Sequence, residues 1–324
     1  MRALSPKLPT TCVGSFPKPE NLLKARALFP KGKISAQELN KIEREATEFW
    51  IRTQEELDYD LLVDGEMYRG DMATYFAENV QGCVISEPVR SYGNRYYKKP
   101  IIVGPIERSN SVTVDWFQFA QSLTSRPIIG MLTGPYTMMD WSFNEYYPSR
   151  RRAAEAWAEV IRPEAQELEA AGAQFIQIDE PAISARVDEL NLAIDTMGRV
   201  VDGLKSKTIT HICYGTFGKI YPKILEIPVD RLDLEFSNSQ LNFLDSLRKY
   251  PFTKEVGFGV VDVHTHVIED KQTVATRIRQ ILEVIPPERV YVDPDCGLKT
   301  RTVEEAIAKL RVIAEAVKEV RATI

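Results

Sequence analysis

A histidine and a cysteine stand one residue apart in the segment "THICYG", as His211 and Cys213. The segment is rich in β-branched residues and is expected to form a strand, on which residues i and i+2 point to the same face. An imidazole and a thiolate that point to the same side suit a zinc ion. Taken alone, the pair fits a buried histidine beside a core cysteine equally well.

Glu235 and Cys296 each follow another run that predicts a strand, so their side chains are expected at the same end of a sheet. Two thiolates, an imidazole and a carboxylate match the softness and the tetrahedral preference of zinc. An iron–sulfur cluster would need more thiolates in close spacing, and magnesium or calcium would prefer oxygen ligands. The sequence therefore predicts one Zn2+ per chain, with the ligands His211, Cys213, Glu235 and Cys296.

This mixed ligand set predicts a catalytic ion. The hard carboxylate of Glu235 is the ligand that a soft sulfur most readily displaces. A thiol bound in its place would stay deprotonated at neutral pH and would be electron-rich enough to attack carbon. A structural zinc protein is the non-enzymatic alternative, but structural sites usually draw their ligands from short Cys-x-x-Cys segments, which this sequence lacks.

The elements that must position these residues alternate between short apolar runs and longer segments of helical period. Eight such pairs predict an α/β fold of the (β/α)8 TIM-barrel type, as a single catalytic domain over residues 1–324. An insertion at about residues 67–126, which includes "VRSYGNRYYKKPIIVG", predicts a β-hairpin over the open end of the barrel after the second strand. The predicted strands are residues 10–16, 60–66, 127–134, 175–181, 208–215, 231–237, 255–262 and 289–297.

Polar side chains gather at the ends of these predicted strands. Because the chemistry of such a barrel lies where its strands end, we expect them to surround one site. They are Ser15, Glu66, Thr133, Asp179, Glu180, His211, Cys213, Glu235, His264 and Cys296.

Composition excludes several classes of partner. The net charge of −5, with acids and bases interspersed, predicts neither nucleic-acid nor membrane binding. The first residues, "MRALSPKLPT", lack the apolar run of a signal peptide, so a cytoplasmic location is expected. Four cysteines in a chain of 324 residues do not predict a disulfide scaffold, and Cys12 and Cys83 are expected to be apolar core side chains.

At these residues the sequence resembles the C-terminal catalytic domain of the cobalamin-independent methionine synthase family. The matching stretches extend along the whole chain and form a specific set. They are "VGSFPKP" (13–19), "DLLVDGEMYRGDMATYF" (60–76), "SYGNR" (91–95), "GMLTGPYTMMDWSF" (130–143), "LEAAGAQFIQIDEPA" (168–182), "HICYG" (211–215), "VVDVH" (260–264) and "DPDCGLKTR" (293–301).

The resemblance implies that the same four residues bind zinc and that the acceptor is homocysteine, which the enzyme converts to methionine. It implies that Glu66 and Asp179 bind the amino group, and that the main chain and hydroxyl of Ser15 bind the carboxylate. His264, with Asp179 a predicted catalytic residue, would lie on the path that protonates N5 of a departing tetrahydrofolate. Trp141 fits a surface that stacks on a flat methyl donor and fits simple core equally well.

The length of the chain bears on the methyl donor. Full-length members of the family carry a second, N-terminal barrel, whereas this chain starts at the catalytic barrel and resembles a short core form. That likeness favours methylcobalamin or a methylated corrinoid protein as the donor. The alternatives are 5-methyltetrahydrofolate (poly)glutamate, which the retained "SYGNR", Trp141 and His264 favour, or another small thiol as the acceptor on the same barrel.

Overall fold

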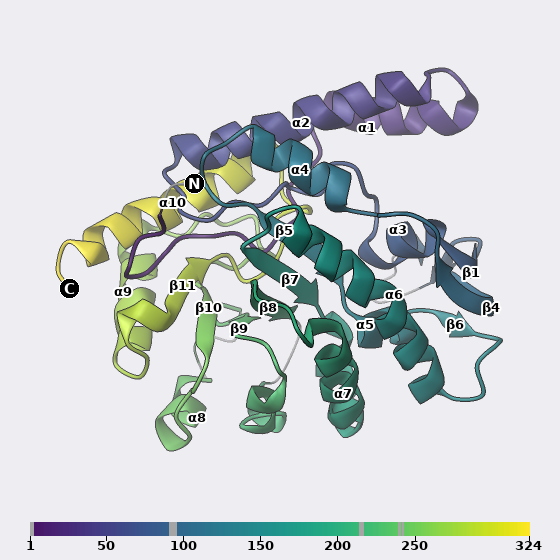
Figure 1. The fold of residues 1–324 in the computed structure, drawn as a ribbon. Coiled ribbons are helices and arrows are strands. Elements are labelled where there is room, and N and C mark those ends of the chain that lie inside the picture. The colour runs from purple at the N-terminus through teal and green to yellow at the C-terminus, as the bar shows by residue number, and fades with distance from the viewer. Residues whose placement is uncertain (1–2, 91–95, 214–216, 239–240, 242) are drawn as a thin grey trace. The chain divides into compact units, whose positions relative to one another are not determined.

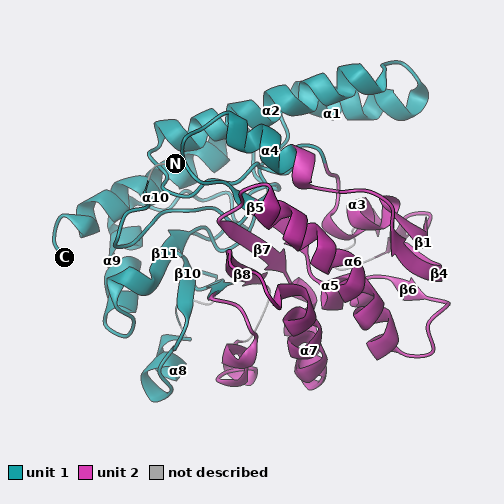
Figure 2. Ribbon diagram, in the orientation of Figure 1, with its two compact units in different colours: residues 1–68, 116–129, 231–324 teal, residues 69–115, 130–230 magenta. Residues whose placement is uncertain are grey.

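The computed structural model describes residues 3–90, 96–213, 217–238, 241 and 243–324. The chain forms two compact units (Figure 2). Unit 1 comprises residues 1–68, 116–129 and 231–324, and unit 2 comprises residues 69–115 and 130–230. Within the described part of the chain, no helix combines the length and the apolar character needed to cross a membrane.

Three parallel strands follow one another in unit 1, and β10 (Glu255–Gly259) lies between β9 (Arg231–Leu234) and β11 (Val290–Asp293). Apart from the first residue of β10, these strands are buried, as expected for runs of Leu, Val and Phe in a parallel sheet. They confirm the cores of the last three predicted strands.

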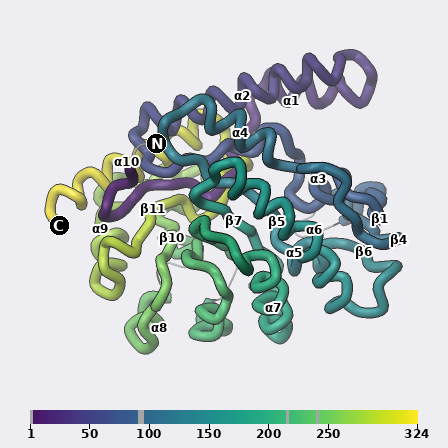
Figure 3. The backbone as a smooth tube through the Cα atoms, viewed as in Figure 1, coloured from purple at the N-terminus to yellow at the C-terminus, as the bar shows by residue number. Residues whose placement is uncertain are grey.

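The N-terminal segment runs beside β11 (Figure 3), where Thr10 forms a parallel bridge to Val292. The amide of Leu61 donates to the Thr10 carbonyl at 3.0 Å, and Leu62 forms a parallel bridge to Ile128. The predicted strands 10–16 and 60–66 therefore occupy their expected places in the strand order, but each is a single bridge rather than a full strand.

Local backbone chemistry explains why the second of these strands is short. At the end of the second run, Gly65 (φ 79°) and Glu66 (φ 60°) both adopt left-handed backbone, which turns the chain out of the extended conformation.

Three helices of unit 1, α2 (Ala36–Glu56), α9 (Lys271–Leu282) and α10 (Val303–Arg321), begin at clear capping residues. Ser35 with Glu38 and Thr302 with Glu305 form capping boxes, and Asp270 accepts from the amide of Thr273. Figure 1 shows these helices together with α1 (Glu20–Leu28), α4 (Val114–Ser122, which begins in unit 2), α8 (Leu244–Lys249) and the 3-10 turns Phe29–Lys31 and Pro287–Arg289.

In unit 2 the strand order is β5 (Ile129–Thr133), β7 (Phe175–Asp179) and β8 (Lys207–Ile212), with β7 parallel to β8. Every residue of β5 and β7 is buried, and in β8 only the first residue is not. These strands confirm the cores of the predicted strands 127–134, 175–181 and 208–215, of which residues 214 and 215 lie outside the described residues.

The predicted insertion is confirmed as a β-rich region after the second strand position. Strand β1 (Val80–Ile85) pairs antiparallel with β4 (Pro100–Arg108), and the short β2 (Val89–Arg90) pairs antiparallel with β3 (Tyr96–Tyr97). A bulge in β1 requires Gly82, because a Cβ atom there would lie 2.0 Å from the carbonyl oxygen of Pro105. The motif "SYGNR" lies outside the described residues.

Helices of unit 2 pack beside its strands, with α6 in contact with both α5 and α7 (Figure 1). The remaining elements of this unit are α3 (Met72–Glu78), α5 (Pro135–Asp140), β6 (Phe143–Asn144), α6 (Arg150–Ala170), α7 (Leu190–Val201) and the 3-10 turns Pro181–Ala185, Val187–Glu189, Phe217–Lys219 and Lys223–Glu226.

Candidate functional site

Two potential metal ligands lie at the end of β8 in unit 2. His211 belongs to the strand, Cys213 follows it, and each is 4% exposed. A ring nitrogen of His211 and the sulfur of Cys213 lie within 4.8 Å of each other. An imidazole and a thiol buried this close together can bind one small cation, because a tetrahedral zinc site places its nitrogen and sulfur ligands about 3.5 Å apart, which lies within this limit.

The neighbouring strand β7 ends in two buried carboxylates, Asp179 and Glu180. The side-chain amide of Gln177, two residues earlier on the same face, donates to Oδ1 of Asp179 at 2.8 Å. The carbonyl of Asp179 accepts from the amide of Gly134 at 2.8 Å, which fixes the end of β7 against the end of β5. The orientation of Asp179 is thus set by its neighbours in unit 2.

Glu180 caps the N-terminus of α5 across the sheet. Its carboxylate accepts from the amides of Tyr136 (2.9 Å) and Thr137 (2.7 Å) and from the Thr137 hydroxyl (2.6 Å). Complete burial, with a smaller contribution from the charge of Asp179, raises the pKa of Glu180 to about 7. A Cβ atom at Gly134 would lie 2.2 Å from the carboxyl carbon of Glu180, so this contact requires glycine there.

The other two predicted residues of unit 2 are Thr133 and Trp141. The hydroxyl of Thr133, the last residue of β5, donates to the carbonyl of Met72 at 2.9 Å, a contact that supports the insertion. Trp141 follows α5 directly, and its amide donates to the Thr137 carbonyl at 2.9 Å. Its indole is half-buried, so its role in donor binding stays a prediction.

Unit 1 brings together three of the predicted residues at the ends of β9, β10 and β11. Nε2 of His264 lies 3.3 Å from Oε1 of Glu235, and Glu235 itself is only 3% exposed. The hydrogen bond with Glu235 is the main cause that raises the pKa of His264 above its usual value, and the nearby Cys296 and Asp262 add to it. Imidazole, carboxylate and thiol therefore lie within electrostatic reach of one another.

Charged side chains stabilise the loop that carries His264. Asp262 accepts from the amide of His264 at 2.7 Å, and Glu269 accepts from the amide of Asp262 at 2.7 Å. Lys309, whose side chain is fully buried in α10, donates to Glu269 at 2.9 Å. A fully buried lysine is rare unless it is paired, and here it anchors the loop.

Asp295, which sequence reasoning did not single out, lies next to Cys296 and is fully buried. Oδ1 accepts from the amides of Phe236 (3.0 Å) and Ser237 (2.9 Å), and Oδ2 accepts from the amide of Asn238 (2.6 Å). Burial is the main cause that raises the pKa of Asp295 to about 7, against the opposing effect of these hydrogen bonds.

Ser15 and Glu66 also lie in unit 1. The carbonyl of Ser15 accepts from the amide of Leu298 at 2.7 Å, and a Cβ atom at Gly297 would lie 2.1 Å from Oγ of Ser15. The amide of Phe16 donates to the carbonyl of Gly65 at 3.1 Å, so the segments that carry Ser15 and Glu66 are joined. The backbone amide of Glu66 donates to Oδ1 of Asp64 at 2.8 Å, which supports its left-handed conformation.

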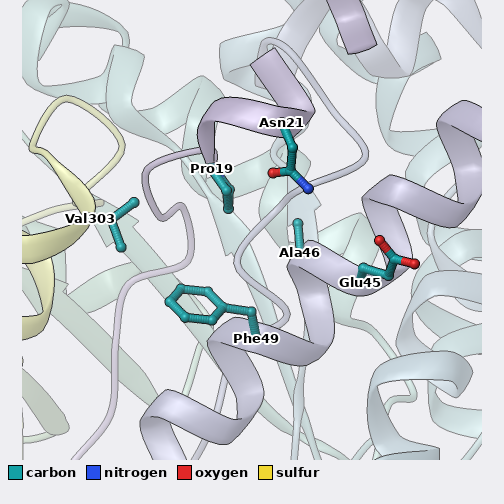
Figure 4. Close-up of a pocket in the computed structure, with 6 residues that line it drawn as sticks. All are labelled: Pro19, Asn21, Glu45, Ala46, Phe49 and Val303. Atoms are coloured by element: carbon teal, nitrogen blue, oxygen red, sulfur yellow. The ribbon is translucent and has the colours of Figure 1, made fainter. Parts of the chain in front are cut away.

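The pocket drawn in Figure 4 is separate from these residues. It has a volume of about 240 Å³ and lies between the starts of α1 and α10 and the middle of α2 in unit 1. Its lining includes the ring of Phe49 and the carboxylate of Glu45 but none of the predicted site residues, so we assign it no role in the chemistry.

The family described as "Cobalamin-independent synthase, Catalytic domain" matches residues 8–319 of this chain. The chain belongs to this family. Membership confirms the resemblance that the sequence motifs indicated, and with the relatives below it confirms the predicted enzyme class, a methyltransferase.

Curated relatives cover nearly all of the chain. It is 38% identical over 317 residues to a methionine synthase of Saccharolobus solfataricus, covering 98% of this chain and 96% of the relative. It is 39% identical over 329 residues to a 5-methyltetrahydropteroyltriglutamate–homocysteine methyltransferase of Campylobacter jejuni, covering 98% of this chain and 44% of that one. The chain thus spans less than half the length of the second relative.

Among solved structures, the fold is similar to that of a B12-independent methionine synthase from a Shewanella species in complex with selenomethionine. The TM-score is 0.87 at 30% identity, and 98% of each chain is covered. This likeness confirms the predicted fold class, an α/β fold of the barrel type. The roles of the predicted zinc ligands and substrate-binding residues remain predictions.

Proposed function

We propose that the protein transfers a methyl group to the sulfur of homocysteine to form methionine. Names of relatives at 38% and 39% identity support both the acceptor and the product. Selenomethionine in the similar Shewanella structure differs from methionine only in the element that carries the methyl group, which further supports a site shaped for methionine.

The donor we propose is 5-methyltetrahydropteroyl (poly)glutamate. The expectation of a corrinoid donor is not supported, because the family is described as cobalamin-independent and the Campylobacter relative is named for a methyltetrahydropteroyltriglutamate substrate. The argument for the corrinoid rested on the likeness to a short core form. The folate alternative, which "SYGNR", Trp141 and His264 favoured, fits these names better.

We propose one zinc ion per chain, held by His211, Cys213, Glu235 and Cys296. The donor chemistry fits, since two sulfurs, one nitrogen and one carboxylate oxygen suit zinc better than calcium, magnesium or an iron–sulfur cluster. The single observation that carries the proposal is the buried His211–Cys213 pair, whose ligand atoms lie within 4.8 Å on one strand end. When bound, zinc supplies the Lewis acidity that keeps a thiol substrate deprotonated at neutral pH.

The side chains of the protein then perform the remaining tasks. Glu66 and the buried Asp179 accept hydrogen bonds from the ammonium of homocysteine, and Ser15 donates to its carboxylate. The sulfur attacks the methyl carbon while the bond from that carbon to N5 of the folate breaks. His264, whose pKa is raised, supplies the proton that N5 needs as it leaves.

The proposal is tested by supplying methylcobalamin, 5-methyltetrahydrofolate monoglutamate and its triglutamate separately with homocysteine and measuring methionine. We expect methionine from a folate donor, and activity with methylcobalamin alone would overturn the donor assignment. X-ray absorption at the zinc edge should show two sulfur ligands in the resting protein and three with homocysteine. A sulfur count that homocysteine leaves unchanged would contradict the proposed activation of the thiol.

A further inference from the structure

The backbone that follows Glu235 is held by one buried side chain from another strand end. Asp295 uses both carboxylate oxygens to accept three consecutive amides, those of Phe236 (3.0 Å), Ser237 (2.9 Å) and Asn238 (2.6 Å). A carboxylate that accepts several backbone amides is a strong and directional anchor. The direction in which the chain leaves Glu235 is therefore fixed by Asp295.

Asp295 also connects the other two strand ends of unit 1. Its own amide donates to the carbonyl of Val261 at 3.1 Å, on the loop that leads to His264, and the next residue is Cys296. Room for its side chain depends on Gly259, because a Cβ atom there would lie 2.3 Å from Oδ1 of Asp295. A single residue thus ties together the segments that carry Glu235, His264 and Cys296.

Arg277 of α9 binds the same segment through a side chain. Its Nη1 donates to Oγ of Ser237 at 2.6 Å and to the carbonyl of Val260 at 2.7 Å. The short segment after Glu235 is consequently bonded through its backbone to Asp295 and through a side chain to Arg277.

We infer that Asp295 is a positioning residue for the metal centre, which holds Glu235 where its carboxylate can bind the zinc until the substrate thiol displaces it. This rests on the proposed function. The three amides occupy the oxygens of Asp295, which explains why a carboxylate adjacent to Cys296 in sequence leaves metal binding to Glu235. Residues that orient a metal ligand without touching the ion typically change metal affinity about 10- to 100-fold when replaced.

The test is the zinc affinity of Asp295→Asn, measured by competition with a chelator. An amide must turn its NH2 group toward at least one of the three backbone amides, so the segment is released at nearly constant volume. We expect a roughly 10- to 100-fold loss of affinity in the resting protein. Saturating homocysteine should remove most of this loss, since the thiol replaces Glu235 as the ligand. A loss that homocysteine does not reduce indicates a merely structural role and overturns the inference.

Asp293→Asn is the matched control, because Asp293 is the last residue of β11, two positions before Asp295, and its carboxylate is 1% exposed and lies against Gly257 in the core. We expect it to lower thermal stability and to leave zinc affinity unchanged, and equal losses of affinity in both variants would overturn the inference. Glu235→Gln distinguishes failure of the proposed zinc ligand set from failure of the inference about Asp295. If it leaves zinc affinity unchanged, the proposed ligand set fails; if it weakens binding while Asp295→Asn does not, the inference alone fails.

Should Asp295→Asn not yield folded protein, Arg277→Met provides an independent variant, since this side chain is partly exposed and supports the same segment through Ser237. A smaller loss of zinc affinity, again reduced by homocysteine, is expected. Wild-type affinity in folded Arg277→Met would count against positioning of this segment.

Discussion

His264 and Glu235 form a side-chain pair in which Nε2 lies 3.3 Å from Oε1. Glu235 is nearly fully buried, whereas the side chain of His264 is 30% exposed. The pair joins the predicted proton donor to a predicted zinc ligand. Displacement of Glu235 from zinc by a thiol would leave its carboxylate free to interact more strongly with the imidazole, which would coordinate thiol binding with protonation of His264.

The first prediction concerns the titration of His264 in metal-free protein. Because Glu235 raises its pKa, Glu235→Gln should lower it toward the unperturbed value of about 6.5. The folded pKa is raised, so the pair stabilises the fold below the unfolded-state pKa, and this stabilisation is lost as pH rises through the folded pKa. Proton NMR of the imidazole resonances measures the shift, and an unchanged midpoint would show that the contact is absent in solution.

The second prediction separates His264 from its neighbour in the loop. His264→Asn should slow methyl transfer from the folate donor by about 10²- to 10⁴-fold, because the departing N5 then lacks its proton donor. His266→Asn is the control, since His266 is exposed and contacts Glu305 at 2.8 Å. Single-turnover rates with saturating homocysteine should fall only for His264→Asn. Similar rates for the two variants would exclude His264 as the acid.

The third prediction addresses the binding of the amino group. Glu66→Gln and Asp179→Asn should each raise KM for homocysteine by roughly tenfold or more, as expected from the loss of a charge-assisted hydrogen bond, and should keep zinc bound. Glu45→Gln, in the pocket of Figure 4, is the control and should behave as wild type. If the two variants lost zinc together with substrate binding, both carboxylates would have to be assigned to the metal centre instead.

The fourth prediction is a pH dependence of stability due to Glu180. Its folded pKa of about 7 lies above the unperturbed value, so between these two pH values the folded state holds a proton that the unfolded state has lost. The free energy of unfolding of the wild type should therefore fall as pH rises, by at most about 1.4 kcal/mol per pH unit from this group. Urea unfolding of wild type and Glu180→Gln at several pH values checks this. Parallel curves for the two proteins would mean that Glu180 is ionised throughout.

Much of the architecture could be predicted because the signals are local. Apolar runs marked six of the eight predicted strand positions as true strands. The strands near Thr10 and Leu62 were overestimated, and at Leu62 sequence alone does not reveal that the left-handed backbone of Gly65 and Glu66 ends the pairing early.

Residue type and strand position led to the predicted zinc ligands, His211, Cys213, Glu235 and Cys296, which stay predictions. The residues that hold those ligands in place were harder to identify. Asp295 acts on backbone amides that lie 57 to 59 positions away in the chain, and nothing in the local sequence indicates which amides a carboxylate will meet. Lys309 is likewise ordinary in a helical sequence, and only burial against Glu269 reveals its role.

Glu66 carries its side chain on left-handed backbone, with φ at 60°, a conformation that costs a residue with a Cβ atom on the order of 1 kcal/mol. A screen for thermal tolerance alone would therefore tend to select glycine or asparagine at this position, and would discard the carboxylate that we assign to the substrate amine. Efforts to engineer a heat-resistant catalyst from this chain should keep position 66 fixed and seek their gains elsewhere.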